Sequence, residues 1–290
     1  MVTAPAAGAA SARATPMVST NLRGSKSVPY FSTDMKRLGQ HFLRNAAVAD
    51  KIASALGVGA GDAVIEIGSG HGELTRRIVK ASAGAANITV LEKDARLAAA
   101  LVRDLPAVTV KEGDALRLLP SAVSEMGGAS WKLVGNIPYY ITGKLLRLVS
   151  ELPHKPERTI LMVQDEVAER LSAKPPHMNR LAASVQFWAD ATIIARVPKG
   201  DFSPPPEVDS AVVLLALREN DGDVGQDRYY SAVRAVFSQP RKTILNNVAA
   251  HADKSREFIE KTLAQAGINA SERPQDLAID NVATIAKLFF

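Results

Sequence analysis

Three glycines, Gly68, Gly70 and Gly72, directly follow the largely apolar segment Val64–Ile67. An amphipathic segment begins at Glu73, so the pattern predicts a strand, a tight turn and a helix. Glycine lets the main-chain amides of such a turn come close to a ligand. The spacing therefore favours a site for a nucleotide-like ligand, although glycine triplets also form plain turns.

Glu73 narrows the class of ligand. A dinucleotide-binding turn has a third glycine three residues after the second, which opens the helix N-terminus to a pyrophosphate. In this chain that position is Glu73, whose carboxylate would repel phosphate. S-adenosylmethionine carries an adenosine and a cationic amino-acid end, so it avoids this conflict. The turn, with Gly68 and Gly70 as its contacts, therefore favours a ligand such as S-adenosylmethionine over a nicotinamide dinucleotide.

Two acidic residues, Glu92 and Asp114, stand at the ends of the second and third predicted strands. Ligands of open α/β sheets bind outside the carboxyl ends of the strands. Glu92 is placed to accept hydrogen bonds from ribose hydroxyls, and Asp114 from an adenine amino group. A single acid here is usually only a solvated strand end, but two beside a glycine turn favour contact with a cofactor.

The fourth predicted strand runs into Gly135-Asn136-Ile137-Pro138-Tyr139-Tyr140, which suits methyl transfer to an adenine amine. This amine is a poor nucleophile because its lone pair is delocalised into the ring. The Asn136 side-chain oxygen and a main-chain carbonyl would hold both amine hydrogens and let the nitrogen become more tetrahedral. Pro138 stiffens the turn, and Tyr139 offers a ring for the base to stack on. The alternative is a proline-terminated strand whose tyrosines only pack.

Phe202 lies on the proline-rich loop 198–209 between the last two predicted strands. It is either the second face of an aromatic clamp or a loop anchor, and the sequence leaves both open. Other chemistries lack their residues: there is no cysteine, no Gly-x-Ser-x-Gly and no Walker loop, and the five histidines lack metal-ligand spacing. We expect no metal site.

The formal net charge of +5 favours a polyanionic partner without proving one. Contacts to RNA phosphates are predicted in three places, at Lys36 and Arg37, at Lys174, and at Arg241 and Lys242. Each of these is more often a solvated cation when considered alone. Together they suit the positioning contacts that hold RNA on a protein surface.

The elements that must position these residues alternate along the chain. Strands are predicted at Val64–Ile67, Ile88–Glu92, Val108–Glu112, Lys132–Gly135, Thr159–Val163, Thr192–Val197 and Ala211–Leu217. Helices are predicted at Ala46–Leu56, Glu73–Lys80, Ala95–Arg103, Gly143–Ser150, Asp165–Ser172 and Arg180–Trp188. The alternation predicts a Rossmann-like α/β fold with a mostly parallel, doubly wound sheet of seven strands. No helix separates the last two strands, so we expect them to pair antiparallel at one end of the sheet.

Only helical patterns follow the polar linker Asn220–Gln226. They cover Tyr229–Ser238, Thr243–Ala250, Arg256–Ala266 and a final helix from about Gln275, with Pro274 in its first turn. We therefore predict a disordered N-terminal tail at 1–33, a methyltransferase domain at 34–219 and a small all-helical domain at 220–290. The tail contains arginine and serine but no acid, so a transit peptide for an organelle is an alternative. The absence of cysteine fits a reducing compartment.

A set of motifs occurs in one order along residues 36–290: Gly39–Leu43, Glu66–Gly72, Glu92, Gly113-Asp114, Asn136–Tyr139, Phe202, Pro204–Ser210 and Phe237–Thr243. In these motifs the chain resembles the bacterial small-subunit rRNA adenine dimethyltransferases, the kasugamycin-susceptibility methyltransferases. The resemblance implies methyl transfer from S-adenosylmethionine to two adjacent adenosines in the 3′-terminal hairpin of small-subunit rRNA. It implies cofactor contacts by His41, Leu43, Gly68, Glu92, Asp114 and Asn136, with Tyr139 and Phe202 flanking the target base. The family often has asparagine in place of His41, which affects the details of that contact.

The resemblance also implies that the substrate is the rRNA of a pre-30S particle, recognised in part by the C-terminal domain. A cytoplasmic monomer that uses neither a membrane nor a metal is expected. The large-subunit rRNA methyltransferases of the erythromycin-resistance type are an alternative, because they share the glycine turn and Asn136–Tyr139. The segments Pro204–Ser210 and Gln239–Thr243 favour the small-subunit class. Another alternative is a ribosome-assembly or transcription factor that has this fold but little catalytic activity. The presence of Glu92, Asp114 and Asn136 argues against it, because such a factor would not need them.

Overall fold

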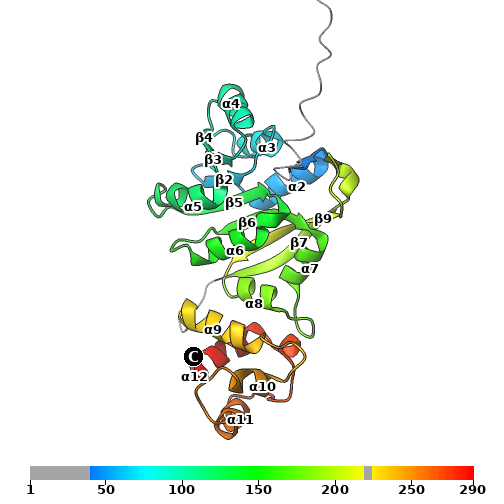
Figure 1. The fold of residues 1–290 in the computed structure, drawn as a ribbon. Coiled ribbons are helices and arrows are strands. Elements are labelled where there is room, and N and C mark those ends of the chain that lie inside the picture. Colours follow the sequence, from blue (N-terminus) through cyan, green and yellow to red (C-terminus); the bar gives the residue numbers. More distant parts are fainter. Residues whose placement is uncertain (1–39, 219–223) are drawn as a thin grey trace, which may run out of the picture.

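The computed structural model describes residues 40–218 and 224–290, which form an α/β part followed by a helical part (Figure 1). The predicted tail, residues 1–33, and the predicted RNA contacts Lys36 and Arg37 lie outside the described residues. The boundary predicted between residues 219 and 220 lies outside them as well, so the division into domains stays a prediction.

The α/β part contains a seven-stranded sheet with the strand order β4-β3-β2-β5-β6-β9-β7. Its strands are β2 (Ala63–Ile67), β3 (Asn87–Glu92), β4 (Thr109–Glu112), β5 (Trp131–Asn136), β6 (Arg158–Gln164), β7 (Ala189–Val197) and β9 (Ser210–Leu217). The strands β2 to β6 are parallel, whereas β9 lies antiparallel between β6 and β7. The predicted seven-stranded sheet with an antiparallel pair at one end is therefore confirmed.

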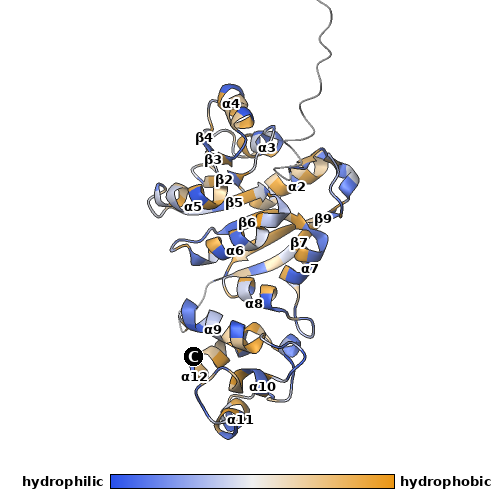
Figure 2. Cartoon of the chain, viewed as in Figure 1, coloured by the Kyte–Doolittle hydropathy of each residue, from blue (hydrophilic) through white to orange (hydrophobic). Residues whose placement is uncertain are grey.

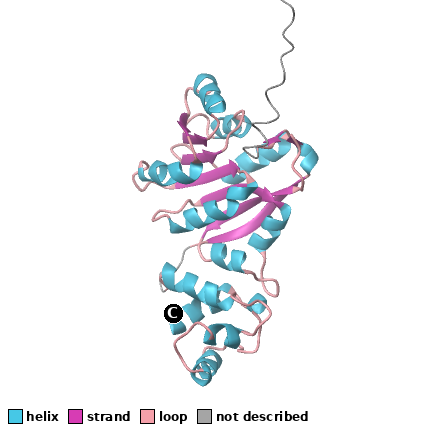
Figure 3. Ribbon diagram, viewed as in Figure 1, coloured by secondary structure: helices cyan, strands magenta, loops and turns pink. Residues whose placement is uncertain are grey.

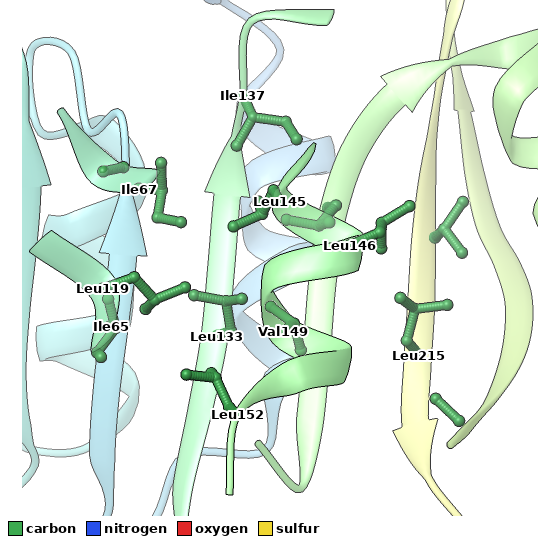
Figure 4. Close-up of a cluster of buried hydrophobic side chains, with 14 of the residues drawn as sticks. Ile65, Ile67, Leu119, Leu133, Ile137, Leu145, Leu146, Val149, Leu152 and Leu215 are labelled. Atoms are coloured by element: carbon green, nitrogen blue, oxygen red, sulfur yellow. The ribbon is translucent and has the colours of Figure 1, made fainter. Parts of the chain in front are cut away.

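Helices cover both faces of this sheet. They are α2 (Ala46–Leu56), α3 (Glu73–Ala81), α4 (Ala95–Asp104), α5 (Ala115–Ser124), α6 (Thr142–Glu151), α7 (Asp165–Ser172) and α8 (Arg180–Gln186). Along β2, Val64 packs in the core cluster of α2 to α4, and Ile65 packs in that of α5 to α8. Figure 4 shows the second cluster, in which Leu145 and Val149 of α6 lie over the sheet. Figure 2 shows β9 hydrophobic along much of its length, as expected for a strand covered on both faces.

Helix ends follow local chemistry. Asn45 caps α2 by accepting from two amides, and Gly57 ends the helix with a positive φ of 60°. Asp114 caps α5 by accepting from a single amide, that of Leu116. The helix α5 was not among the predicted helices, because Pro120 lies inside it and a proline removes one backbone donor.

A two-stranded ladder joins distant parts of the chain. The strand β1 (Phe42–Leu43) pairs antiparallel with β8 (Phe202–Ser203), and Leu43 lies opposite Phe202. Strands of two residues have no detectable periodicity, so the sequence did not indicate them. The ladder holds the segment before α2 against the loop before β9.

The C-terminal part is all helical over its described residues (Figure 3). It contains α9 (Gln226–Val236), α10 (Ile244–Ala249), α11 (Arg256–Gln265) and α12 (Ile279–Phe289). The prediction of a single final helix from about Gln275 is wrong. Pro274–Asp276 forms a short 3-10 turn, and extended backbone at Leu277 (ψ 132°) separates it from α12. The hydrophobic core of the C-terminal part also contains Met178 and Ala182, which come from the segment around α8. No described helix is long and apolar enough to cross a membrane.

Candidate functional site

A pocket lies at the carboxyl ends of β2, β3 and β5, and we call it the main pocket. Its lining includes eight of the predicted site residues: His41, Gly68, Gly70, Glu92, Asp114, Asn136, Pro138 and Tyr139. These residues come from five separate segments of the chain. The parallel strands bring them together because their carboxyl ends meet at one edge of the sheet.

The glycine turn forms one wall of this pocket. Gly68, Gly70 and Gly72 all have positive φ, at 69°, 57° and 79°. A side chain at Gly70 would also lie 2.8 Å from the ring of Phe42. Glycine is therefore required here for both its backbone angles and its small size.

Glu92 connects this turn to β3. Its Oε2 accepts from the Gly70 amide at 3.1 Å, and its Oε1 accepts from the Asp94 amide at 2.9 Å. The side chain is 3 % exposed, and burial raises the pKa of Glu92, while these amide donors oppose the shift. Each carboxylate oxygen can accept a second hydrogen bond. Glu92 is thus held in place with acceptor capacity left for a ligand hydroxyl.

Asp114 lies beside Glu92, caps the start of α5 and remains accessible to a ligand. Its Oδ1 accepts from the Leu116 amide at 2.9 Å, which starts α5, and its Oδ2 lies 3.6 Å from Lys93 Nζ. Its side chain is 42 % exposed, so a ligand can reach it. The Gly113 amide donates to the Glu92 carbonyl at 2.8 Å, which fixes the two acids relative to one another.

Asn136 has a defined orientation. Its Nδ2 donates to the main-chain carbonyl of His41 at 2.8 Å. No donor among the described residues is bound to its Oδ1. This leaves the side-chain oxygen of a half-buried asparagine available as an acceptor at the wall of the main pocket.

Two rings, those of Tyr139 and His41, border the same space. They lie almost parallel, at 19°, with their centroids 6.1 Å apart. The Tyr139 hydroxyl is 2.7 Å from Ser210 Oγ, and His41 Nδ1 is 2.9 Å from the Pro204 carbonyl. Burial raises the pKa of Tyr139, so its hydroxyl stays protonated near neutral pH. Both rings are therefore anchored at their polar ends.

Phe202 does not join this group. Its side chain is 3 % exposed and packs in the core cluster with Val197 and Val212. It does not line the main pocket, so the structure does not place it as a second face of a base clamp. The reason is the β1–β8 ladder, which draws the residue into the core and suits its alternative role as a loop anchor.

A second hollow lies beyond the glycine turn and shares Gly68, Gly70 and Asn136 with the main pocket. Leu43, a predicted cofactor contact, lines this hollow rather than the main pocket. So does Glu73, whose side chain is 64 % exposed at the start of α3.

Sequence reasoning missed two residues of the second hollow, Glu66 and Ser69. Glu66 is 1 % exposed, and burial raises its pKa to about 7. Its Oε2 and the Oγ of Ser69 are buried and form no hydrogen bond of normal geometry to a described residue, although the Thr75 hydroxyl nearby opposes the rise in the pKa of Glu66. The sequence did contain an indication, because a carboxylate inside the apolar strand Val64–Ile67 is costly to bury without a purpose.

The predicted RNA contacts within the described residues lie outside the main pocket. Lys174 is exposed between α7 and α8, and Arg241 and Lys242 are exposed between α9 and α10. Asn247 holds the segment between α9 and α10 in place. Its side chain is 1 % exposed and donates to the carbonyls of Val236 and Gln239, at 2.7 and 3.0 Å. Within residues 40–218 and 224–290, no cluster of histidine, aspartate or glutamate side chains could hold a metal ion.

Comparison with known proteins gives consistent results. The family described as "Ribosomal RNA adenine dimethylase" matches residues 32–289. The chain is 36% identical to Ribosomal RNA small subunit methyltransferase A of Dehalococcoides mccartyi over 250 residues, covering 84% of each chain. It is 39% identical to the protein of that name from Pelotomaculum thermopropionicum over 271 residues, covering 88% of this chain and 90% of the relative.

Two solved structures share the fold. A dimethyladenosine transferase from Plasmodium falciparum superposes with a TM-score of 0.69 at 24% identity, covering 84% of this chain and 96% of that one. The 23S rRNA methyltransferase ErmE superposes with a TM-score of 0.67 at 24% identity, covering 85% of this chain and 98% of that one. The Rossmann-like methyltransferase fold expected from the sequence is confirmed.

Proposed function

Because the chain belongs to the ribosomal RNA adenine dimethylase family, we propose that it dimethylates two adjacent adenosines of small-subunit rRNA. The methyl groups come from S-adenosylmethionine, and the product is N6,N6-dimethyladenosine in the 3′-terminal hairpin. The enzyme acts as a monomer on a pre-30S particle, and the helical part of the chain contributes to RNA recognition.

One observation carries the catalytic part of this proposal. Asn136 Nδ2 is occupied by the His41 carbonyl, so Asn136 Oδ1 is presented as the acceptor. An adenine amine has two hydrogens and needs acceptors rather than donors around it. The side chain therefore fits an exocyclic amine and would not suit a carbonyl oxygen in the same position.

The residues present fit S-adenosylmethionine. The glycine turn leaves room for a ligand at the end of β2, and Glu92 keeps acceptor capacity for ribose hydroxyls. The unpartnered Oε2 of Glu66 and Oγ of Ser69 suit an ammonium group, which has three donors. When bound, the cofactor supplies an electrophilic methyl group on a sulfonium. Asp114 and Glu92 would hold its adenosine, and the second hollow its amino-acid end.

The chain's own residues then position the base. Tyr139 offers the anchored ring on which the adenine stacks, after the base has left its helix. Asn136 Oδ1 and a main-chain carbonyl of the Asn136–Pro138 turn would accept the two amine hydrogens in the first transfer, and one of these acceptors would hold the single remaining hydrogen in the second. Held in this way, the nitrogen turns its lone pair toward the methyl group, and no side-chain base is needed before transfer. Once the N–C bond has formed and the S–C bond has broken, which would leave a neutral thioether, the methylated amine would lose its proton to water.

The choice of rRNA rests on the relatives. Both sequence relatives are named for the small ribosomal subunit, at 36% and 39% identity, whereas the likeness to ErmE at 24% identity speaks for the fold alone. The large-subunit alternative is thus the less supported one.

Incubation with labelled S-adenosylmethionine and either immature 30S or immature 50S particles tests the proposal. We expect the label on two adjacent adenines near the 3′ end of the 30S rRNA, located by mass spectrometry of nuclease fragments. The Asn136→Ala variant serves as the control for background transfer. Labelling of the 50S rRNA alone, or of no adenine in either particle, would overturn the proposal.

A further inference from the structure

Tyr140 differs sharply from its neighbour Tyr139. The Tyr140 side chain is 61 % exposed and borders the main pocket. The Tyr139 hydroxyl is bound at Ser210, whereas the Tyr140 hydroxyl has no hydrogen-bond partner within the described part of the chain. A ring that is exposed at the edge of the main pocket offers a face on which a flat ligand group can stack.

The backbone that carries Tyr140 is well fixed. Tyr139–Ile141 forms a 3-10 turn in which the Ile141 amide donates to the Pro138 carbonyl at 3.1 Å. The Thr142 amide donates to the Tyr139 carbonyl, and α6 follows at once. Tyr140 therefore projects from a short turn held between β5 and α6, and its ring has little backbone freedom to lose on binding.

A cation, Lys144, follows Tyr140 four residues later in the chain. Lys144 follows in the first turn of α6, is exposed, and forms no ion pair with a described residue. Gly143, which precedes Lys144 in the chain, is exposed, and a Cβ added to it would meet no atom within 4 Å. An exposed aromatic ring and an exposed cation four positions later suit the base and the phosphate of a nucleotide.

We propose that Tyr140 is the stacking platform for the base next to the adenine in the pocket, with Lys144 beside the phosphate that connects them. This inference rests on the proposed function and deepens it. Two adjacent adenosines must each enter the main pocket. While one base lies against Tyr139, its unstacked neighbour loses its own stacking partner, and Tyr140 replaces that partner at the mouth of the pocket.

The platform has consequences for the reaction. Stacking of one base corresponds to roughly a tenfold change in affinity. Because the contact is made by a base that is not reacting, it stabilises the bound substrate and the transition state equally. Its loss therefore raises KM and leaves kcat almost unchanged. Loss of the contact also lets the RNA dissociate after the first adenosine is dimethylated and before the second one is. Particles with only one dimethylated adenosine therefore accumulate.

The test compares Tyr140→Ala, Tyr140→Phe and Tyr140→Trp with wild type on immature 30S particles. We expect the alanine variant to raise KM about tenfold at similar kcat and to accumulate particles with a single dimethylated adenosine. The phenylalanine and tryptophan variants should retain the wild-type KM, because the ring and not the hydroxyl makes the contact. Val102→Ala is the control, since Val102 is a large apolar side chain that is 57 % exposed on α4, outside the main pocket and outside the helical part.

Two outcomes would overturn the platform: an alanine variant with the KM and product pattern of wild type, or a phenylalanine variant as impaired as the alanine variant. Both are judged against active wild-type protein. Wild-type protein that methylates no adenine in 30S particles would instead refute the proposed function itself. Lys144→Ala adds an independent check, because it should lower the slope of log affinity against log salt by about one.

Discussion

The side-chain Nδ2 of Asn136 donates a hydrogen bond of 2.8 Å to the main-chain carbonyl of His41, 95 residues earlier in the chain. This contact joins the end of β5 to the segment that leads into β1. It decides which end of the Asn136 amide faces the main pocket. His41 therefore contributes to the main pocket twice. Its main-chain carbonyl orients Asn136, and its ring borders the same space as Tyr139.

Replacing Asn136 by alanine should remove most turnover and leave cofactor binding largely intact. The substitution deletes the acceptor for the amine, and loss of one such preorganised hydrogen bond lowers kcat by about 100-fold or more. Calorimetry with S-adenosylmethionine and single-turnover methylation of 30S particles measure the two effects. Turnover close to that of wild type would show that Asn136 does not hold the amine.

Replacing Glu92 by alanine should weaken S-adenosylmethionine by about 1–3 kcal/mol, as expected when charge-assisted hydrogen bonds are lost. Glu92→Gln separates two causes, because it keeps the size of the side chain that supports Gly70 but removes the charge. Glu112→Ala is the control, since Glu112 ends the neighbouring strand and does not line the main pocket. Calorimetry provides the affinities, and equal values for Glu92→Ala and wild type would contradict a ribose contact.

Glu66 should make the stability of the free protein depend on pH. Burial raises the pKa of Glu66 from 4.5 to about 7. Between these values Glu66 keeps its proton in the folded chain and releases it in the unfolded chain, so its contribution to the free energy of unfolding falls as pH rises and levels off above about pH 7. Glu66→Gln does not titrate, and its stability relative to wild type should rise by on the order of 3 kcal/mol across this window. Urea unfolding at pH 4.5 and pH 8 checks this, and a pH-independent difference would rule it out.

Phe202 should prove to be a core residue. Its burial predicts that Phe202→Ala lowers the free energy of unfolding by about 3–5 kcal/mol. Phe202→Leu fills most of the space and should keep most of the wild-type kcat. Denaturant titration and methylation kinetics measure the pair. A stable Phe202→Leu variant with most of its activity lost would instead support a clamp role for the ring.

The cations between α9 and α10 should contribute to RNA binding without affecting the reaction. Arg241→Ala and Lys242→Ala should each weaken binding to 30S particles and reduce the salt slope by about one, because each removes one phosphate contact. Lys51→Ala and Lys80→Ala are suitable controls, since both residues are exposed on α2 and α3. A salt slope equal to that of wild type would place the RNA elsewhere.

Much of the fold could be predicted because its signals are local. The tight turn after β2 could be predicted from Gly68, Gly70 and Gly72, because glycine adopts a positive φ without strain, and all three have a positive φ in the structure. The alternation of strands and helices predicts the seven-stranded sheet. A parallel sheet then brings the residues at its strand ends together, so Glu92, Asp114 and Asn136 meet in one pocket.

What the amino-acid sequence could not reveal depends on contacts between distant segments. The ladder that places Leu43 opposite Phe202 has no local pattern, and it is the reason that Phe202 turns into the core. The difference between a bound Tyr139 and an exposed Tyr140 depends on Ser210, 71 positions beyond Tyr139. Periodicity and propensity report the conformation of neighbouring residues. Whether a side-chain ring faces protein, ligand or water is decided only when the whole chain packs. Packing between segments that are distant in sequence leaves few empty spaces and few buried polar groups without a hydrogen bond, and this condition selects the orientation of each ring.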